Sequence, residues 1–414
     1  MSAYTLIIAA SVLIILSYFF NLISKRFNIP SVLLLIITGI LINQAMGSMS
    51  IGTVDWFPYL EILGIVGLIM IVLEAALDLK LEREKLPVIG KSLLIALIGL
   101  VVATELAAAV IYFFIPGFDW LTATIYATPL SILSSAIIIP SVANMAEEKR
   151  EFSVYESTFS DILGIMLFYF LLTLAGPSTG SEAVGGFVTG LLITILVSAV
   201  ASYGLIYIFQ NIKTQVKTFL LIAILILLYA IGKQLHLSSL IIILVFGLVI
   251  SNSHLFFPEF LKKTIKPESI KTLYHELHIV TGETAFIVRT FFFIIFGITI
   301  VLSSLLSIQV ILVSVIILAT IYGLRLVLFR LFMGKDIFPT VYIAPRGLIT
   351  VLLFFAIPKE LQVEQFQSGI LLFIIIATSI VMTWAMLRAN KKDVEDEVLE
   401  MLSKPDEEAP TTTD

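Results

Sequence analysis

The sequence contains no cysteine and carries little charge. Only 13% of its 414 residues are charged and 59% are hydrophobic, whereas soluble domains have about 25% charged and about 45–50% apolar residues. The absence of cysteine excludes disulfide frameworks and thiol-based metal or redox chemistry. Because charge is so scarce, the chain cannot cover itself with a polar shell. We therefore expect its solvent to be a lipid bilayer.

Apolar runs recur along nearly the whole chain. A helix needs about 20 residues to cross a hydrocarbon core, and the length of each run is close to that. We predict an all-α polytopic membrane protein whose transmembrane domain occupies residues 1–390. About thirteen spans are expected, near 4–24, 31–45, 58–78, 92–115, 119–145, 151–175, 184–210, 217–232, 236–252, 279–302, 304–329, 338–357 and 367–388.

The distribution of Lys and Arg indicates how these spans are oriented. Alternate connections and the tail carry 20 of the 25 basic residues, whereas the intervening loops carry only Lys233 and Lys359. The positive-inside rule then places the amino terminus outside and the carboxyl terminus in the cytoplasm. Residues 391–414 hold nine acidic and three basic residues, which predicts a short, disordered cytoplasmic tail. A multi-pass protein of the cell (inner) membrane is expected.

The remaining three basic residues, Arg289, Arg325 and Arg346, fall inside predicted spans. A charge near the centre of a membrane helix costs about 2.5–3.5 kcal/mol, so it persists only where it faces a protein or water-filled interior. Arg325 lies near a cytoplasmic end, where it can snorkel, and is given a structural role. The other two need partners inside the protein. The acidic candidates within spans are Glu74, Asp78, Glu105, Glu156, Asp161 and Glu283.

The richest polar stretch runs from Glu156 to Asp161 in the sixth span and reads Glu-Ser-Thr-Phe-Ser-Asp. At helical spacing, Ser157 and Asp161 share one face while Glu156 and Ser160 share another. One carboxylate can then face an ion cavity while the other pairs with a base. Packing alone would not require two carboxylates at this depth, so Asp161 is predicted to be functional.

Two spans contain sequences that interrupt helices. The fifth includes Thr128-Pro129 and Pro140, and the twelfth includes Pro345-Arg346-Gly347. Proline removes a backbone donor and leaves the carbonyl four residues earlier without its helical partner, so that it can ligate a cation. Two interrupted helices far apart in a chain are typical of inverted-repeat transporters, whose ion sites form where the broken helices meet.

At this point the sequence resembles the cation/proton antiporters, members of the monovalent cation:proton antiporter superfamily, and most closely their NhaP-type sodium/proton exchanger branch. The resemblance covers about residues 4–390 and implies a dimerisation domain beside a core ion-transport domain. The segments that carry it are Arg26-Phe27-Asn28-Ile29-Pro30 with Gly39, Glu74 to Asp78, Thr128-Pro129, Glu156-Ser157, Ser160-Asp161, Phe291-Phe292-Phe293 with Gly297, and Arg346-Gly347.

The resemblance implies that Asp161 alternately binds a proton or a monovalent cation. Thr128 and Ser157 would supply further oxygen ligands, and Glu74 would contribute through a water molecule. Such a protein is a secondary antiporter that works by alternating access without a cofactor. Na⁺ is the first choice of cation, with Li⁺ or K⁺ as alternatives. A homodimer in the bilayer is expected, and no nucleic-acid partner.

The same resemblance implies an ion pair between Glu156 and Arg346. Ser160 departs from the family pattern, which has Asn or Asp before the key aspartate. The lack of a second aspartate favours electroneutral exchange, while Arg289 is a candidate basic residue near the core.

Two alternatives stay open. A proton-coupled organic-anion or solute transporter would use Arg289 and Arg346 to hold the anion. An intramembrane enzyme would need a catalytic histidine at membrane depth, but all four histidines are predicted in or beside loops, so no enzymatic activity is expected. These histidines are His236, His254, His275 and His278.

Overall fold

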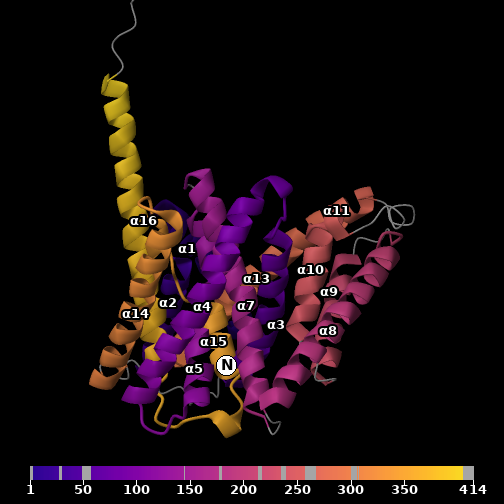
Figure 1. Cartoon of the computed structure of the whole chain (residues 1–414), viewed down its shortest axis with the longest axis horizontal. Coiled ribbons are helices and arrows are strands. Elements are labelled where there is room, and N and C mark those ends of the chain that lie inside the picture. Colours follow the sequence, from indigo (N-terminus) through magenta and orange to yellow (C-terminus); the bar gives the residue numbers. More distant parts are fainter. Residues whose placement is uncertain are drawn as a thin grey trace, which may run out of the picture.

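The computed structural model describes residues 3–27, 30–48, 57–143, 145–176, 180–212, 217–234, 239–256, 267–299, 305 and 307–403. Within these ranges the chain is almost entirely helical and contains no β-strand, which confirms the all-α prediction. Figure 1 shows long helices packed side by side, with α16 (Gly369–Ser403) extending past one end of the bundle and the amino terminus near the other.

The helices follow one another along the chain with short connections. The first half contains α1 (Ala3–Phe27), α2 (Ser31–Ser48), α3 (Phe57–Asp78), η1 (Arg83–Lys85), α4 (Leu86–Phe114), α5 (Trp120–Ser131), α6 (Ser135–Ser141) and α7 (Glu147–Leu174). The second half contains α8 (Gly180–Phe209), α9 (Lys217–Gln234), α10 (Ser239–Ser251), α11 (Ser253–Phe256), α13 (Pro267–Thr299), α14 (Ile308–Met333), η3 (Thr340–Tyr342), α15 (Leu348–Phe355), η4 (Lys359–Leu361) and α16.

The helices have the length and composition of membrane spans. In the described part of the chain, eight are long and apolar enough to cross a membrane, and three more apolar helices are shorter. The protein is therefore a multi-pass membrane protein, while the count of thirteen spans stays a prediction. Only 6% of the span in α1 is buried, against 89% of the segment Trp120–Ser141. The most buried of the eight spans is thus the one that is broken into α5 and α6.

The helices form two groups that meet at α3 and α8. One group contains α4, α5, α6, α7, α14, α15 and α16, and in the other α13 packs on α2 and α3 while α10 packs on α3, α8 and α9. Of the second group, α3 also contacts α6, α7 and α15, and α8 contacts α7. The first group repeats one order, in which a straight helix, an interrupted helix and a straight helix follow one another. That order agrees with the predicted repeats, whose inverted orientation stays a prediction.

Two glycines bring α2 and α13 together. A Cβ atom added to Gly39 would lie 2.8 Å from the Cα atom of Gly297, closer than real side chains approach a backbone. Only glycine at both positions allows the two backbones to touch. Nearby, the hydroxyl groups of Ser17 on α1 and Thr290 on α13 are 2.6 Å apart. The glycines of the family resemblance therefore serve helix packing.

One expectation needs correction. The helix of the tenth predicted span begins at Pro267 and not near residue 279, so His275 and His278 lie inside α13 and not in or beside a loop. The Nε2 atom of His278 is 2.7 Å from Oδ1 of Asp78. His236 lies outside the described residues.

α16 continues past residue 390, where the transmembrane domain is predicted to end, to Ser403. This stretch contains Glu, Lys and Leu, which favour helix, and has no proline or glycine to stop it. Disorder of the tail stays a prediction. Residues 404–414 lie outside the described part.

Candidate functional site

The interrupted span contains an extended segment between two short helices. α5 ends at Ser131 and α6 begins at Ser135, with extended backbone at Ile132 and Ser134. A break in a membrane helix leaves N–H and C=O groups without helical partners, and such groups cost several kcal/mol each in an apolar setting if unpaired. The residues that supply hydrogen-bond partners to these N–H and C=O groups therefore define the site.

Three consecutive N–H groups in the break are satisfied by groups from elsewhere in the chain. The N–H of Leu133 donates to Oγ of Ser160 at 3.0 Å, and the N–H of Ser135 donates to Oδ2 of Asp161 at 3.2 Å. The N–H of Ser134 between them donates to the carbonyl of Pro345 in the second interrupted span, at 3.0 Å. Ser160 and Asp161 therefore act side by side as acceptors for the broken helix. Ser160 departs from the family pattern of Asn or Asp, and its hydroxyl accepts this hydrogen bond without adding a charge.

The carbonyl groups at the break accept from Arg346. Its Nε donates to the carbonyl of Leu130 at 2.8 Å, its Nη2 to that of Ser131 at 3.2 Å, and its Nη1 to that of Ala344 at 2.7 Å. The guanidinium is 2% exposed. Carbonyls at the end of α5 are thus occupied by a side-chain cation, and ligation of a transported cation by carbonyls that a proline has freed stays a prediction. With all three of its nitrogens donating to backbone, Arg346 is a poor clamp for an organic anion.

The predicted pair of Glu156 with Arg346 is wrong, because Glu156 pairs with Arg325. Nη1 and Nη2 of Arg325 donate to the two carboxylate oxygens of Glu156 at 2.7 and 3.2 Å. Arg325 also donates to the backbone around η3, so the prediction that it snorkels to the membrane surface is wrong too. Its partners there are the carbonyls of Thr340, Val341 and Ile343, at 3.2, 3.0 and 3.2 Å.

Asp161 is a buried carboxylate that uses only one of its two oxygens in hydrogen bonds among the described residues. The residue is 3% exposed, and its Oδ2 accepts the N–H of Ser135. Its other oxygen, Oδ1, is buried and has no hydrogen-bond partner among the described residues. Asp161 lines a narrow cavity of about 20 Å³ together with Ile71, Ala75 and Ile349. A buried carboxylate oxygen in this position is stabilised by binding either a proton or a cation.

The two predicted hydroxyl ligands lie on α5 and α7, the helices that carry the break and Asp161, but each donates to a backbone carbonyl of its own helix. Oγ1 of Thr128 donates to the carbonyl of Thr124 at 2.8 Å, and Oγ of Ser157 donates to that of Val154 at 3.1 Å. Both residues are fully buried. Neither hydroxyl is hydrogen-bonded to Asp161 in the described part of the chain. As donors they still have oxygen lone pairs that can ligate a cation.

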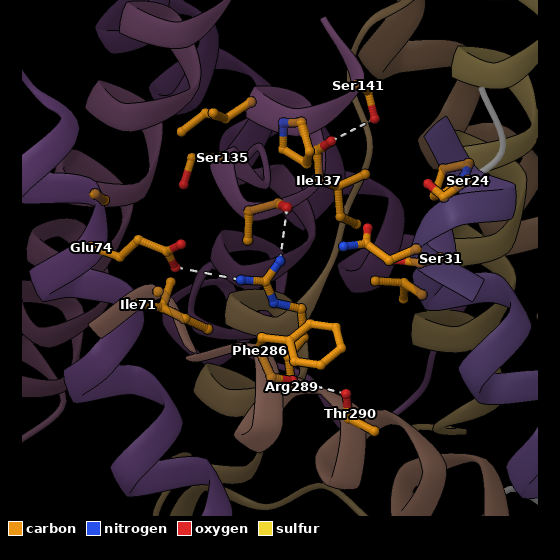
Figure 2. Close-up of a pocket in the computed structure, with 18 of the residues that line it drawn as sticks. Ser24, Ser31, Ile71, Glu74, Ser135, Ile137, Ser141, Phe286, Arg289 and Thr290 are labelled. Carbon is orange, nitrogen blue, oxygen red and sulfur yellow. Dashed lines mark hydrogen bonds and ion pairs between the residues drawn. The ribbon is translucent and has the colours of Figure 1, made fainter. Parts of the chain in front are cut away.

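Glu74 faces a larger cavity of about 400 Å³ at the junction of the two helix groups. Figure 2 shows Arg289 reaching from α13 into this cavity, with Glu74 on one side and Ser135 nearby. Nη2 of Arg289 lies 3.4 Å from Oε2 of Glu74, and Nη1 donates to the carbonyl of Ala136 on α6 at 3.2 Å. The candidate basic residue therefore does contact the interrupted span. Glu74 and Asp161 lie on different cavities, and Ser135 is beside both.

Arg325 is the residue of this site whose partner the sequence did not identify. Its place near the cytoplasmic end of the eleventh predicted span gave it only a structural role at the membrane surface. The signal that could have found it is that a buried Glu156 requires a cation, for which two arginines competed. The hydrogen bond between Thr378 Oγ1 and the N–H of Arg346, at 3.1 Å, had no distinctive signal in the sequence.

Two interrupted helices that meet beside a buried carboxylate, inside a multi-pass helical bundle, define a secondary transporter. A sequence model of the family described as "Sodium/hydrogen exchanger, transmembrane" matches residues 9–388. The chain therefore belongs to the sodium/hydrogen exchanger family, which is a family of transporters and not of enzymes.

Solved structures show the same fold. The sodium proton antiporter MjNhaP1 from Methanocaldococcus jannaschii, in its structure at pH 8, is 20% identical with a TM-score of 0.66, and the match covers 94% of this chain and 95% of that one. The electron-microscopy map of MjNhaP1 matches with 17% identity, a TM-score of 0.67 and coverage of 99% and 100%. A sequence comparison with curated proteins gives no match.

Proposed function

We propose that this chain exchanges Na⁺ for H⁺ across the membrane, with Asp161 binding either ion in turn. The observation that carries this proposal is the unpaired Oδ1 atom of a buried carboxylate placed where two interrupted helices meet. Either a proton or a cation can bind that oxygen, so the two ions compete for one group. Family membership and the antiporter fold support the same reading.

The cation would be held by oxygen atoms. Hard alkali cations prefer carboxylate, hydroxyl and carbonyl oxygens. Asp161 supplies the charge, and the lone pairs of Thr128 and Ser157 would complete part of the shell. Glu74 would act through a water in the larger cavity, which is roomy enough for several. Li⁺ and K⁺ remain alternatives to Na⁺, because selectivity depends on the ligand distances in the loaded state.

The exchange is proposed to be electroneutral. Ser160 stands where a second carboxylate would add a charge, and Glu156 is already neutralised by Arg325. The site then offers one exchanging carboxylate, Asp161, which binds one proton in one half of the cycle and one monovalent cation in the other. No net charge crosses the membrane in such a cycle.

Alternating access would come from movement of one helix group against the other. The group that carries the interrupted spans contacts the other mainly through α3 and α8, so its sliding repacks only these two helices of the second group. The second group, with its exposed apolar helices α1 and α8, would remain in place and form the homodimer. Movement of the Asp161 region past α3 then exposes the site to one side at a time.

The test is a pH-gradient dequenching assay in proteoliposomes, with each alkali cation and with the membrane potential clamped or free. Asp161→Asn should abolish exchange and leave folding intact. Glu105→Gln is a matched control, because it neutralises an intramembrane carboxylate that is exposed on α4. Cation-coupled proton flux that survives in Asp161→Asn would refute the site. A rate that depends on the clamped potential would refute electroneutrality.

A further inference from the structure

The three intramembrane arginines are held very differently. Arg325 and Arg346 are 8% and 2% exposed, and every nitrogen of both guanidinium groups donates to a carboxylate or a backbone carbonyl. Arg289 makes only two hydrogen bonds among the described residues, of 3.2 and 3.4 Å, and its side chain is 17% exposed. Its Nε is buried without a partner among the described residues. Arg289 is therefore the one of the three that can leave its partners at small cost.

The oxygens that Arg289 contacts are ones that a free cation would also seek. Pro140 has no N–H, so the carbonyl of Ala136, four residues earlier, loses the helical donor it would otherwise have. Nη1 of Arg289 fills that vacancy, and Nη2 faces the carboxylate of Glu74. One carboxylate oxygen and one carbonyl freed by a proline form an oxygen pair suited to a hard monovalent cation. The guanidinium stands where such a cation would bind.

This oxygen pair lies close to Asp161, the proposed transport carboxylate. Ala136 follows Ser135, whose N–H donates to Asp161. Ile71 and Ala75 line both the larger cavity and the narrow one that contains Asp161. A cation that travels through the larger cavity to Asp161 passes this oxygen pair and the positive charge of Arg289.

We propose that Arg289 is a tethered competitor of the transported cation: its guanidinium occupies an entry site formed by Glu74 and the carbonyl of Ala136, and an alkali cation takes these oxygens when the guanidinium withdraws. This inference rests on the proposed function. Arg289 thereby sets the apparent affinity for the cation and keeps Glu74 neutralised while no cation is present. It is a specificity-determining residue and does not carry the exchange itself.

The experiment measures the Na⁺ dependence of exchange in proteoliposomes, as KM and Vmax separately. Arg289→Gln should lower KM for Na⁺ about tenfold, which corresponds to about 1.4 kcal/mol, with Vmax little changed. Arg289→Lys keeps the charge and should stay near the wild type. Arg330→Gln, which removes an exposed arginine of α14, is the control for a general change of charge. In the Glu74→Gln background, Arg289→Gln should no longer shift KM.

Chemical rescue gives a second readout that a structural role would not produce. In Arg289→Ala, millimolar guanidinium chloride should raise KM back toward the wild-type value, because the free ion refills the same oxygen site. A KM that is unchanged or higher in Arg289→Gln, or an equal shift in the Glu74→Gln background, would overturn the proposal. If Arg289→Gln does not fold, Arg289→Ala with and without guanidinium decides. Loss of all exchange in the wild type would instead overturn the proposed function.

Discussion

The pair of Glu156 with Arg325 gives the sharpest prediction about stability. Arg325→Met removes the charge and keeps most of the side-chain length, so Glu156 is left as a buried carboxylate without its cation. The two groups are 3% and 9% exposed. Breaking one partner of a buried pair costs about 3–5 kcal/mol. Because three backbone carbonyls around η3 lose their donor as well, we expect a loss at the upper end of that range.

The assay is denaturant unfolding in mixed micelles, with free energies compared in a double-mutant cycle. Glu156→Gln should cost less than Arg325→Met, since the amide can still accept from Arg325. The double variant should be more stable than the sum of the two single losses predicts, with a coupling of about 0.5–3 kcal/mol. Arg330→Met on the same helix is the control. It is exposed, and its effect should stay within about 0.5 kcal/mol.

Two outcomes would refute the reasoning. If Arg325→Met unfolds no more easily than Arg330→Met, the buried guanidinium does not stabilise the site. If the losses of the two single variants simply add, the pair is not coupled, and Glu156 must be stabilised by other groups.

Three further predictions concern packing, the crossing and the surface. Gly297→Val should separate α2 from α13 at Gly39 and lower the thermal unfolding temperature, whereas an unchanged melting curve would show that the helices can part freely. Arg346→Gln should reduce both stability and exchange, since carbonyls of the broken helix lose their donor; normal folding would contradict this role. Lys85 donates a hydrogen bond to the carboxylate of Glu151, which raises the pKa of Lys85, so any stability the pair adds is present at neutral pH and lost only as pH rises past the ordinary lysine value of about 10.4. Lys85→Met should cost under about 1 kcal/mol at pH 7, and a larger loss in chemical denaturation would contradict that.

The two interrupted spans illustrate how far local sequence reaches. Pro129, Pro140 and Pro345 removed backbone donors whatever the surroundings, so breaks in these spans were predictable. The segment that is extended in the fifth span, however, lies three residues after Pro129. Its place is fixed by acceptors from other helices, above all Ser160 and Asp161. A proline therefore predicts that a helix breaks, and the tertiary partners decide where.

The ion-pair partner of Glu156 is a feature that the sequence could not determine. Burial of Glu156 predicted a cation, and the sequence offered Arg325 and Arg346 without ranking them correctly. The true partner is 169 residues away along the chain. Coulomb energy and hydrogen bonding depend on distances of a few ångströms between atoms on separate helices. No spacing along the sequence encodes those distances.

The sequence by itself determined the solvent and the helical class, because scarce charge and long apolar runs allow only a helical bundle in lipid. It also marked the buried acids and bases, since a charge at membrane depth needs a reason wherever it lies. Only the tertiary structure decided which of these charges neutralise each other. In the folded protein Glu156 pairs with Arg325, and Arg346 donates to backbone carbonyls. One oxygen of Asp161 has no partner among the described residues, and Arg289 lies in the neighbouring cavity. Those outcomes follow from helix packing, in which shape complementarity fixes the positions and electrostatics acts only at the distances that packing allows.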